Sequence, residues 1–323
     1  MGQAKGWLEG AAYVVVIGVL SLAYAVGHRL GAHPVAFILY AMIATALATL
    51  VAFGTGPEAL AIVRHPLSWI AGLAIILVEV FYFQTITYVA PAHGNVVVRI
   101  ATPLAIVTGW ALLGRRPLPV AWLGGAVVVL GVATIVAFTP PAVRWPMAIM
   151  GTLTGACMVV RGFAGELHPI NRAARTVRDK LRFTGVVVLV TAAMSLATAA
   201  LAAIAVASGA LPATRMLPTL QEMAHVPTIV LGGLGGGAIL TLMMVLNFSA
   251  VVKIGTANFT ALMAFSPLAI WVFQEAGVAL GWIEAARPDA SVVAAMVVCI
   301  AGVLLIFLAD VLARRVAPGA ARR

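Results

Sequence analysis

Long apolar runs separated by short polar breaks form the main pattern of this chain. Most runs are about eighteen residues or longer, which is enough for a helix to cross the ~30 Å core of a bilayer. Strands of a membrane barrel would instead alternate apolar and polar residues over about ten positions. The pattern predicts ten transmembrane helices, near Leu8–Gly27, Pro34–Phe53, Leu67–Ala90, Gly94–Leu113, Val120–Phe138, Pro146–Phe163, Phe183–Ser208, Pro227–Val252, Ile254–Gln274 and Ser291–Leu312.

Composition excludes an ordinary soluble domain. Of the 323 residues, 63% are hydrophobic and only 9% are charged, and the mean hydropathy is +1.09. Soluble domains carry about 25% charged residues. In a bilayer the backbone polar groups must be bonded within the protein, and a helix achieves this by itself. We therefore expect an all-α polytopic membrane protein.

The basic residues are divided unequally between the two ends of the predicted helices. If the N-terminus is cytoplasmic, the external segments hold four, Arg29, Arg144, Arg215 and Arg287. Cytoplasmic loops are enriched in Lys and Arg, so the bias predicts a multi-pass inner-membrane protein with both termini in the cytoplasm. The fifteen basic residues of the cytoplasmic segments are Lys5, Arg64, Arg115, Arg116, Arg161, Arg172, Arg175, Arg178, Lys180, Arg182, Lys253, Arg314, Arg315, Arg322 and Arg323.

The first predicted span also resembles a signal peptide. Lys5 precedes an apolar run that ends at Ala23-Tyr24-Ala25, a pattern of small residues typical of a cleavage site. Removing this helix would leave an odd number of spans and would break the repeat described next. We therefore expect the helix to be retained.

A short motif occurs twice in the chain. Thr102-Pro103-Leu104-Ala105-Ile106 recurs as Ser266-Pro267-Leu268-Ala269-Ile270, and 266 − 102 gives a separation of 164 residues. Five spans separate the copies, so the two halves would enter the membrane in opposite directions, as in carriers with inverted repeats. The alternative is a chance match in an Ala- and Leu-rich chain. The repeat predicts two five-helix units, 1–140 and 141–323, with a cytoplasmic linker at 165–182 in the second.

The repeated prolines predict kinks in the fourth and ninth spans. Proline removes one backbone hydrogen bond, and a preceding hydroxyl can bond the freed carbonyl. The predicted kink sites are therefore Thr102, Pro103, Ser266 and Pro267, each pair behind a very short polar turn, at Pro91–Gly94 and Lys253–Thr256.

The chain resembles the drug/metabolite transporter superfamily in its EamA-type branch. The resemblance covers almost the whole chain and rests on ten spans, cytoplasmic termini and the paired Ser/Thr-Pro helices, with Tyr88–Val128 as the best match. Family members usually carry a glutamate about where Arg116 stands here. The resemblance implies solute transport by alternating access, usually export of amino acids or related metabolites.

Two charged residues lie well away from the ends of predicted spans, Glu79 in the third and Arg99 in the fourth. A charge at the centre of a membrane helix costs at least ~2.5 kcal/mol, so it faces a cavity, finds a partner or takes up a proton. One hypothesis is that Glu79 and Arg99 bind the ammonium and carboxylate of a zwitterion, or that Glu79 carries a coupling proton. The other is a structural salt bridge with Arg99 extending toward the surface.

Several uncharged residues are weaker candidates for the substrate site. Asn95 and Asn258 lie just inside the two helices that carry the repeated motif, and either could instead bond between helices. Tyr82 and Trp110 could stack on a flat or cationic solute, although aromatic residues in spans more often pack. The glycine cluster at 232–237 predicts a close helix crossing, with a flexible gate as the alternative.

The sequence favours a secondary transporter, and the resemblance implies an export role. An importer of a vitamin, a nucleotide-like compound or another small organic solute is the alternative. A membrane-embedded lipid-modifying enzyme is disfavoured, because no Asp-rich, HExxH or GxSxG motif is present. We expect no enzymatic activity, no metal and no cofactor. The expected partners are membrane lipid, a small-molecule solute and a coupling proton, with no nucleic acid, in a monomer or homodimer.

Overall fold

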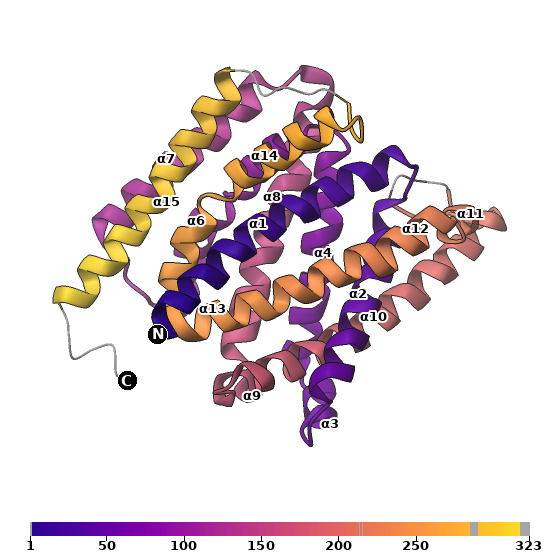
Figure 1. Cartoon of the computed structure of the whole chain (residues 1–323), viewed down its shortest axis with the longest axis horizontal. Coiled ribbons are helices and arrows are strands. Elements are labelled where there is room, and N and C mark those ends of the chain that lie inside the picture. The colour runs from indigo at the N-terminus through magenta and orange to yellow at the C-terminus, as the bar shows by residue number, and fades with distance from the viewer. Residues whose placement is uncertain (1, 213, 215, 285–289, 317–323) are drawn as a thin grey trace.

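The computed structural model describes residues 2–212, 214, 216–284 and 290–316 (Figure 1). Within these ranges it consists of helices joined by short connections, with no strand. Ten described segments are long and apolar enough to cross a membrane, which confirms the predicted number. Arg215, Arg287, Arg322 and Arg323, used in the charge count above, lie outside the described residues.

The elements follow one another as a helical bundle in which consecutive spans alternate in direction. The N-terminus, α3 and α9 lie along the lower side of Figure 1; we call this end of the bundle the basic face and the other end the opposite face. The elements are α1 (Gly2–Arg29), α2 (Pro34–Phe53), α3 (Ala59–Arg64), α4 (Pro66–Ile86), α5 (Pro91–Val98), α6 (Ala101–Leu113), α7 (Pro119–Phe138), α8 (Pro141–Leu167), α9 (Pro169–Ala173), α10 (Val177–Ala207), α11 (Leu220–Met223), α12 (Val226–Val230), η1 (Leu231–Gly236), α13 (Gly237–Met263), α14 (Ser266–Ala279) and α15 (Ala290–Val316).

Most predicted spans match these helices, but several boundaries differ. Pro91–Gly94, predicted as a turn, is the first turn of α5, because proline is well suited to open a helix. The helix α8 begins at Pro141 and continues to Leu167, several residues beyond the predicted end. Arg161, counted with the cytoplasmic segments although it falls within the predicted span Pro146–Phe163, lies six residues before the end of α8.

The fourth and ninth spans are interrupted just before the repeated prolines. The first break separates α5 from α6 at Arg99 and Ile100. The second separates α13 from α14 at Ala264 and Phe265, and Pro267 lies in the first turn of α14. Proline has no backbone N–H, so it fits the first turn of a helix, where that donor would have no partner in the helix. Each span therefore continues beyond the break as a second helix with a different direction.

The chain reverses direction between the eighth and ninth spans within a single residue. Gly255, inside α13, has φ 81° and ψ 158°, which is a left-handed conformation open mainly to glycine. The Asn258 side chain donates to the Ile254 carbonyl at 2.7 Å across this break. The predicted short turn at Lys253–Thr256 is therefore a glycine break bridged by an asparagine.

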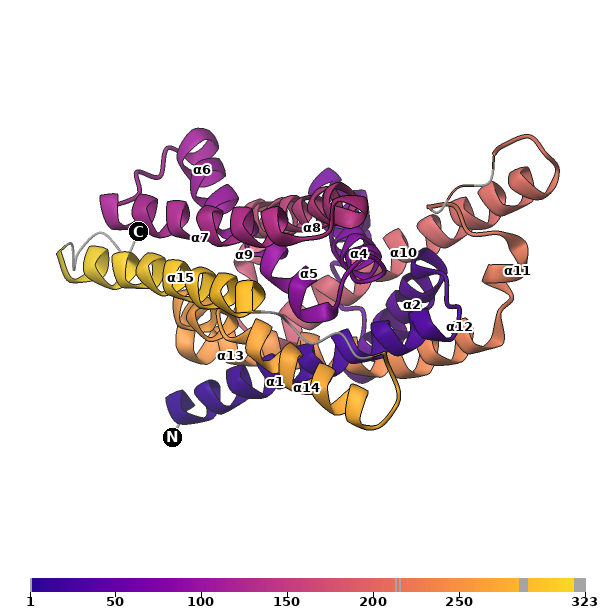
Figure 2. The same ribbon diagram turned by 90° about the horizontal axis from the view of Figure 1, so that it is seen from above.

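Packing pairs bring helices from the two halves of the chain together. The most extensive helix–helix contacts join α7 to α15, α4 to α8, α1 to α13, and α2 to α10. Figures 1 and 2 both show α7 and α15 side by side at one edge of the molecule. A side chain at Gly124 of α7 would meet the Gly302 carbonyl of α15 at 2.7 Å, so these two helices approach as closely as small residues allow.

The predicted linker at 165–182 is only partly a loop. It contains the last residues of α8, the short helix α9 and the first turn of α10. The Thr176 hydroxyl accepts from the Asp179 backbone at 3.1 Å and so caps α10.

Candidate functional site

Glu79 lies deep in the bundle and is held by a tyrosine. It stands 13 residues after Pro66, so helix rise places it ~20 Å along α4. The Tyr24 hydroxyl of α1 donates to Glu79 Oε2 at 2.8 Å. Tyr24 is fully buried, with its ring stacked on Phe83 at 4.9 Å and edge-on to Phe37. The tyrosine is thereby fixed in place and leaves the second carboxylate oxygen of Glu79 without a described hydrogen bond.

Arg99 is anchored by residues from both halves of the chain. Its Nη2 donates to Asn95 Oδ1 at 2.6 Å and also bonds the Ser266 hydroxyl of α14. Ser266 in turn donates to Asn95 Oδ1 at 3.1 Å. The Arg99 Nε is buried and has no hydrogen-bond partner among the residues that the structure describes. Two of the predicted residues, Asn95 and Ser266, therefore position the guanidinium, which sits at the break between α5 and α6.

Tyr82 bonds the asparagine that holds Arg99. Its hydroxyl shares a hydrogen bond of 2.8 Å with Ser21 of α1 and also bonds the Asn95 side chain. Tyr82 is 7% exposed and Asn95 is 6% exposed, so both lie inside the protein. The predicted residues Glu79, Tyr82, Asn95 and Arg99 are thus brought together on α4 and α5, facing α1 and α14.

Arg161 is a further charged residue of this region that the sequence did not indicate. It lies on α8, the helix that packs along α4, which carries Glu79. Among the described residues Arg161 makes no hydrogen bond and no ion pair. We call the following residues the central cluster: Tyr24, Glu79, Tyr82, Asn95, Arg99, Arg161 and Ser266.

A salt bridge between Glu79 and Arg99, the alternative hypothesis from the sequence, is not formed in the structure. Glu79 is paired with Tyr24, and Arg99 with Asn95 and Ser266. The ion pairs of the described residues lie elsewhere, between Arg115 and Glu166 and between Lys253 and Glu9. The two charges are therefore held separately, each by neutral polar groups.

Two predicted candidates lie apart from this hydrogen-bonded network. Trp110 on α6 is 51% exposed and packs edge-on against Trp122 of α7, with ring centroids 5.7 Å apart. Asn258 bonds the backbone beside Gly255, as described above. Of the predicted kink residues, Thr102 and Pro103 lie in the first turn of α6 and Ser266 and Pro267 in that of α14. Ser266 bonds the Arg99 guanidinium, whereas the Thr102 backbone donates to the Arg99 carbonyl at 2.9 Å.

A cavity of about 430 Å³ opens at the opposite face, next to the central cluster. Its lining includes Ala25, Ile86, Pro91 and Gln274. Ala25 follows Tyr24, and Ile86 and Pro91 stand about one helix turn from Tyr82 and Asn95 in sequence. At its base the Gln274 side chain accepts from the Ala92 backbone at 3.2 Å. We call this cavity the vestibule, because four helices of the cluster continue into its wall.

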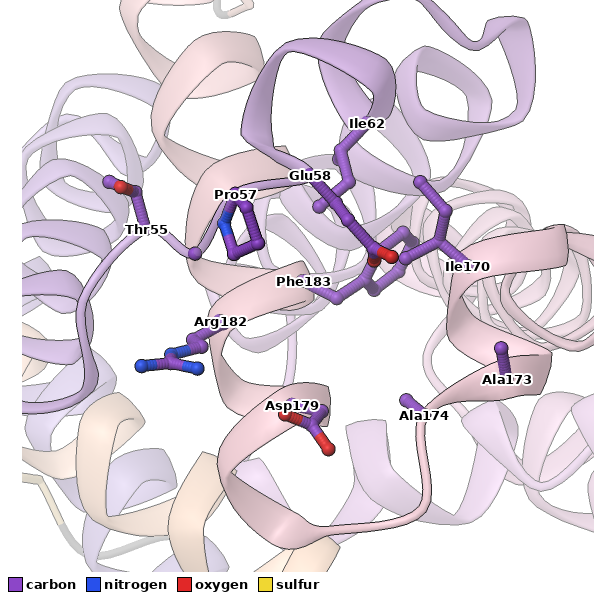
Figure 3. Close-up of a pocket in the computed structure, with 11 residues that line it drawn as sticks. Thr55, Pro57, Glu58, Ile62, Ile170, Ala173, Ala174, Asp179, Arg182 and Phe183 are labelled. Carbon is purple, nitrogen blue, oxygen red and sulfur yellow. The ribbon is translucent and has the colours of Figure 1, made fainter.

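A second cavity, of about 350 Å³, opens at the basic face beside the linker (Figure 3). Two of its charged side chains, Arg182 and Asp179, bond groups at the ends of helices. Arg182 Nε donates to the Phe53 carbonyl at 2.6 Å, at the end of α2, and Asp179 bonds the Thr176 hydroxyl that caps α10. Figure 3 shows Arg182 and Asp179 on α10, with Glu58 across the cavity over Phe183. This cavity is not connected to the central cluster by any described hydrogen bond.

Comparison with known proteins yields a structural match only. No family model matches the chain, and no curated protein does. A solved structure described only as "Crystal structure of protein" superposes with a TM-score of 0.56 at 20% sequence identity, over 97% of this chain and 99% of the other. The likeness shows the fold alone. The whole chain thus adopts an architecture already seen in a solved protein of nearly the same extent.

Proposed function

We propose that this protein is a secondary carrier of the drug/metabolite transporter type, which exports a small metabolite such as an amino acid by alternating access. The observation that carries the proposal is the central cluster. Three charged side chains lie within spans of an apolar bundle without a carboxylate–guanidinium pair between them. Ionisable groups inside a membrane are costly and typically mark a substrate or ion pathway.

The arrangement of the helices supports two inverted halves within this carrier. The third span, α4, corresponds to the eighth, α13, and the first span, α1, corresponds to the sixth, α8. Exchanging the two halves therefore converts the α4–α8 pair into the α13–α1 pair, and both pairs pack extensively. The α7–α15 and α2–α10 pairs convert into themselves. The breaks before Pro103 and Pro267 also correspond. Such pairing is what a pseudo-two-fold axis in the membrane plane would produce, and carriers of this design bind their solute between the repeats.

The vestibule supports a pathway on one side of the cluster. It opens at the opposite face, whereas the Ser21–Tyr82 and Ala92–Gln274 hydrogen bonds lie between it and Arg99. In an alternating-access cycle, these bonds would separate to connect the cluster with the vestibule. The direction that we propose, export, follows from the resemblance to the EamA-type branch.

Solute counterflow in proteoliposomes tests the proposal. Purified protein is reconstituted, loaded with a metabolite mixture rich in amino acids and assayed for exchange by mass spectrometry. Glu79→Gln is compared with Glu275→Gln, a matched carboxyl-to-amide change in α14. Glu275 accepts from Trp271 Nε1 at 3.2 Å, a bond that glutamine can also accept.

We expect the wild-type protein and Glu275→Gln to exchange one class of solute and Glu79→Gln to lose this exchange. Equal exchange by all three proteins would support a carrier but remove Glu79 from its pathway. If folded wild-type protein moves nothing from a broad mixture, the carrier proposal is wrong.

A further inference from the structure

An apolar groove of about 330 Å³ runs along the outside of the bundle between α4 and α6. The helix α8 forms its floor, because α8 packs against both α4 and α6, whereas those two make at most slight contact with each other in the described part of the chain. The lining residues are Leu67, Ile70, Leu104, Thr108, Leu112, Ala156, Val159, Val160, Phe163, Ala164 and Leu167. Thr108 alone among them has a polar side chain, so the groove suits a hydrocarbon chain rather than a polar solute.

The apolar groove extends from the basic face to about the middle of the membrane. The helices α6 and α8 end at this face and α4 begins there. Leu104 lies eight residues before Leu112 on α6, which corresponds to ~12 Å of helix. Ala156 lies eleven residues before Leu167 on α8, which corresponds to ~17 Å. One leaflet of a ~30 Å hydrocarbon core has about this depth. Leu112, Val160 and Leu167 are exposed, so the groove opens sideways to the bilayer.

Positive charge collects where the groove meets the basic face. Arg115, just after α6, pairs with Glu166 near the end of α8. The Arg115 guanidinium carbon lies 5.9 Å from the ring centroid of Phe163, which lines the groove. Arg116 is the next residue, and Arg64 ends α3, directly ahead of α4. Both are exposed and make no side-chain hydrogen bond or ion pair among the described residues. Three arginines and one carboxylate thus leave an excess of two positive charges at this end of the groove.

We infer that the apolar groove is a binding site for an anionic phospholipid of the leaflet at the basic face. One acyl chain lies in the groove, and the phosphate meets Arg64 and Arg116, whose donors are free, beside the Arg115–Glu166 pair. Guanidinium groups bind phosphate oxygens through charge-assisted hydrogen bonds. Basic pockets between membrane helices select anionic head groups, because the ammonium of a zwitterionic head group is repelled. The lipid joins α4 and α6 of the first half to α8 of the second, whether or not the protein is a carrier.

Two phospholipids with the same acyl chains form the test: phosphatidylglycerol, which is anionic, and phosphatidylethanolamine, which is zwitterionic. Purified protein, stripped of lipid in a neutral detergent, is titrated with each. Native mass spectrometry measures bound lipid, and thermal unfolding measures stability. Inorganic phosphate is titrated separately, because it has the head-group chemistry without a chain. We expect phosphatidylglycerol to bind about tenfold or more tightly than phosphatidylethanolamine and to raise the melting temperature more, and inorganic phosphate to leave it unchanged.

A double arginine variant tests the head-group end of the groove. Arg64→Gln combined with Arg116→Gln removes the excess positive charge and should abolish the preference for phosphatidylglycerol. The matched control combines Arg172→Gln with Arg175→Gln, two exposed arginines of the same face without a described side-chain bond. The control should keep the preference, because these arginines lie on or beside α9, away from the residues that line the groove.

A valine variant tests the apolar part of the groove. Val160→Trp places a large ring in the groove and should weaken the binding of phosphatidylglycerol and phosphatidylethanolamine several-fold. Val129 on α7 is equally exposed, at 44%, and does not line the groove, so Val129→Trp should leave binding unchanged. The melting temperature without lipid shows whether each variant is folded. Should Val160→Trp not fold, the arginine variants still decide the test, because Arg64 and Arg116 are exposed and make no described side-chain bond.

Three outcomes overturn the inference. Equal binding of the two phospholipids, or an equal loss of the preference in both double arginine variants, would mean that the basic face attracts anionic lipid without a specific site. A melting temperature raised as much by inorganic phosphate as by phosphatidylglycerol would assign the arginines to a free anion. Unchanged lipid binding by a folded Val160→Trp variant would mean that the acyl chain does not occupy the groove.

Discussion

At the level of single residues, the Tyr24–Glu79 hydrogen bond makes a sharp prediction. Tyr24→Phe removes the hydroxyl but keeps the ring stacked on Phe83, so the protein should fold with a loss of ~0.5–1.5 kcal/mol. Without its donor, Glu79 loses its fixed orientation, and we expect solute exchange to fall several-fold. Counterflow and thermal unfolding measure the two effects.

A second tyrosine provides the control for this substitution. Tyr40 donates to the Met223 carbonyl at 2.8 Å, a bond of the same length outside the central cluster. Tyr40→Phe should therefore cost similar stability and leave exchange unchanged. An equal loss of exchange in both variants would show that Tyr24 acts through stability alone.

His168, between α8 and α9, predicts a pH dependence of stability. It is fully buried, shares a hydrogen bond of 3.0 Å with Ser68 and lies 4.3 Å from the His65 ring. Burial, with the His65 charge as the second cause, lowers the pKa of His168 from 6.5 to about 4. Below pH 6.5 the unfolded chain takes up a proton that the folded protein does not, so stability falls as the pH drops and the loss is complete near pH 4.

Thermal unfolding at pH 7 and pH 5 measures this effect. The shift corresponds to ~2 kcal/mol at pH 5, or ~1 kcal/mol after screening by solvent. His168→Gln keeps a polar side chain but cannot titrate, so its melting temperature should fall less between the two pH values than that of the wild type. An identical fall in both proteins would contradict a neutral, buried His168.

The sequence predicted part of the central cluster, and the reasons for the omissions are physical. Glu79 and Arg99 stood out because charges are rare in apolar runs. Arg161 did not, because the predicted span ended at 163 and an arginine near a helix end is normally solvated. Tyr24 appeared only within a cleavage-like motif, since a tyrosine in a span gives no sign of its partner. Which polar groups hold each charge depends on contacts between distant helices.

At the level of elements, the glycines of η1 predict opposite effects at neighbouring positions. A Cβ at Gly232 would lie 2.7 Å from the Phe37 carbonyl of α2, whereas Gly233 has open space. Gly232→Ala must therefore separate η1 from α2, and we expect a loss of ~1–3 kcal/mol. Gly233→Ala should leave stability unchanged or raise it slightly, because alanine has a higher helix propensity than glycine.

Thermal unfolding of the two variants in detergent measures this difference. The contact of Gly232 with α2 favours the close-crossing interpretation of the glycine cluster, and η1 remains helical. Similar melting temperatures for both variants would show that η1 and α2 separate easily, as a flexible gate would require.

Element positions were predictable to a limited extent. Long apolar runs located the ten spans, but proline was ambiguous: Pro91 opens α5, while Pro103 and Pro267 follow breaks in longer spans. Pairing between spans was not predictable, because helices that are apolar on most faces do not reveal which face meets protein and which meets lipid. The close approach of Gly124 and Gly302 is visible only once α7 and α15 are placed together.

At the level of the whole molecule, the inverted repeat predicts that positions 164 residues apart lie on opposite sides of the membrane. Arg116 and Leu280 are such a pair, since 280 − 116 gives 164, and both are exposed just after a helix of the repeated motif. In a chain with Cys157 and Cys299 replaced by alanine, Leu280→Cys should react with an impermeant maleimide on intact cells. Arg116→Cys should react only after the membrane is opened.

The two cysteine positions separate the repeat from the orientation. A reversed labelling pattern would keep the inverted repeat and place the termini outside, against the bias of the basic residues. Labelling of both positions from one side would mean that the halves are parallel, and the matching breaks at Pro103 and Pro267 would then not be related by an axis in the membrane plane. In a carrier with inverted repeats, the two halves exchange conformations and so open the central site to each face in turn. This mechanism requires the two cysteines to be labelled from opposite sides.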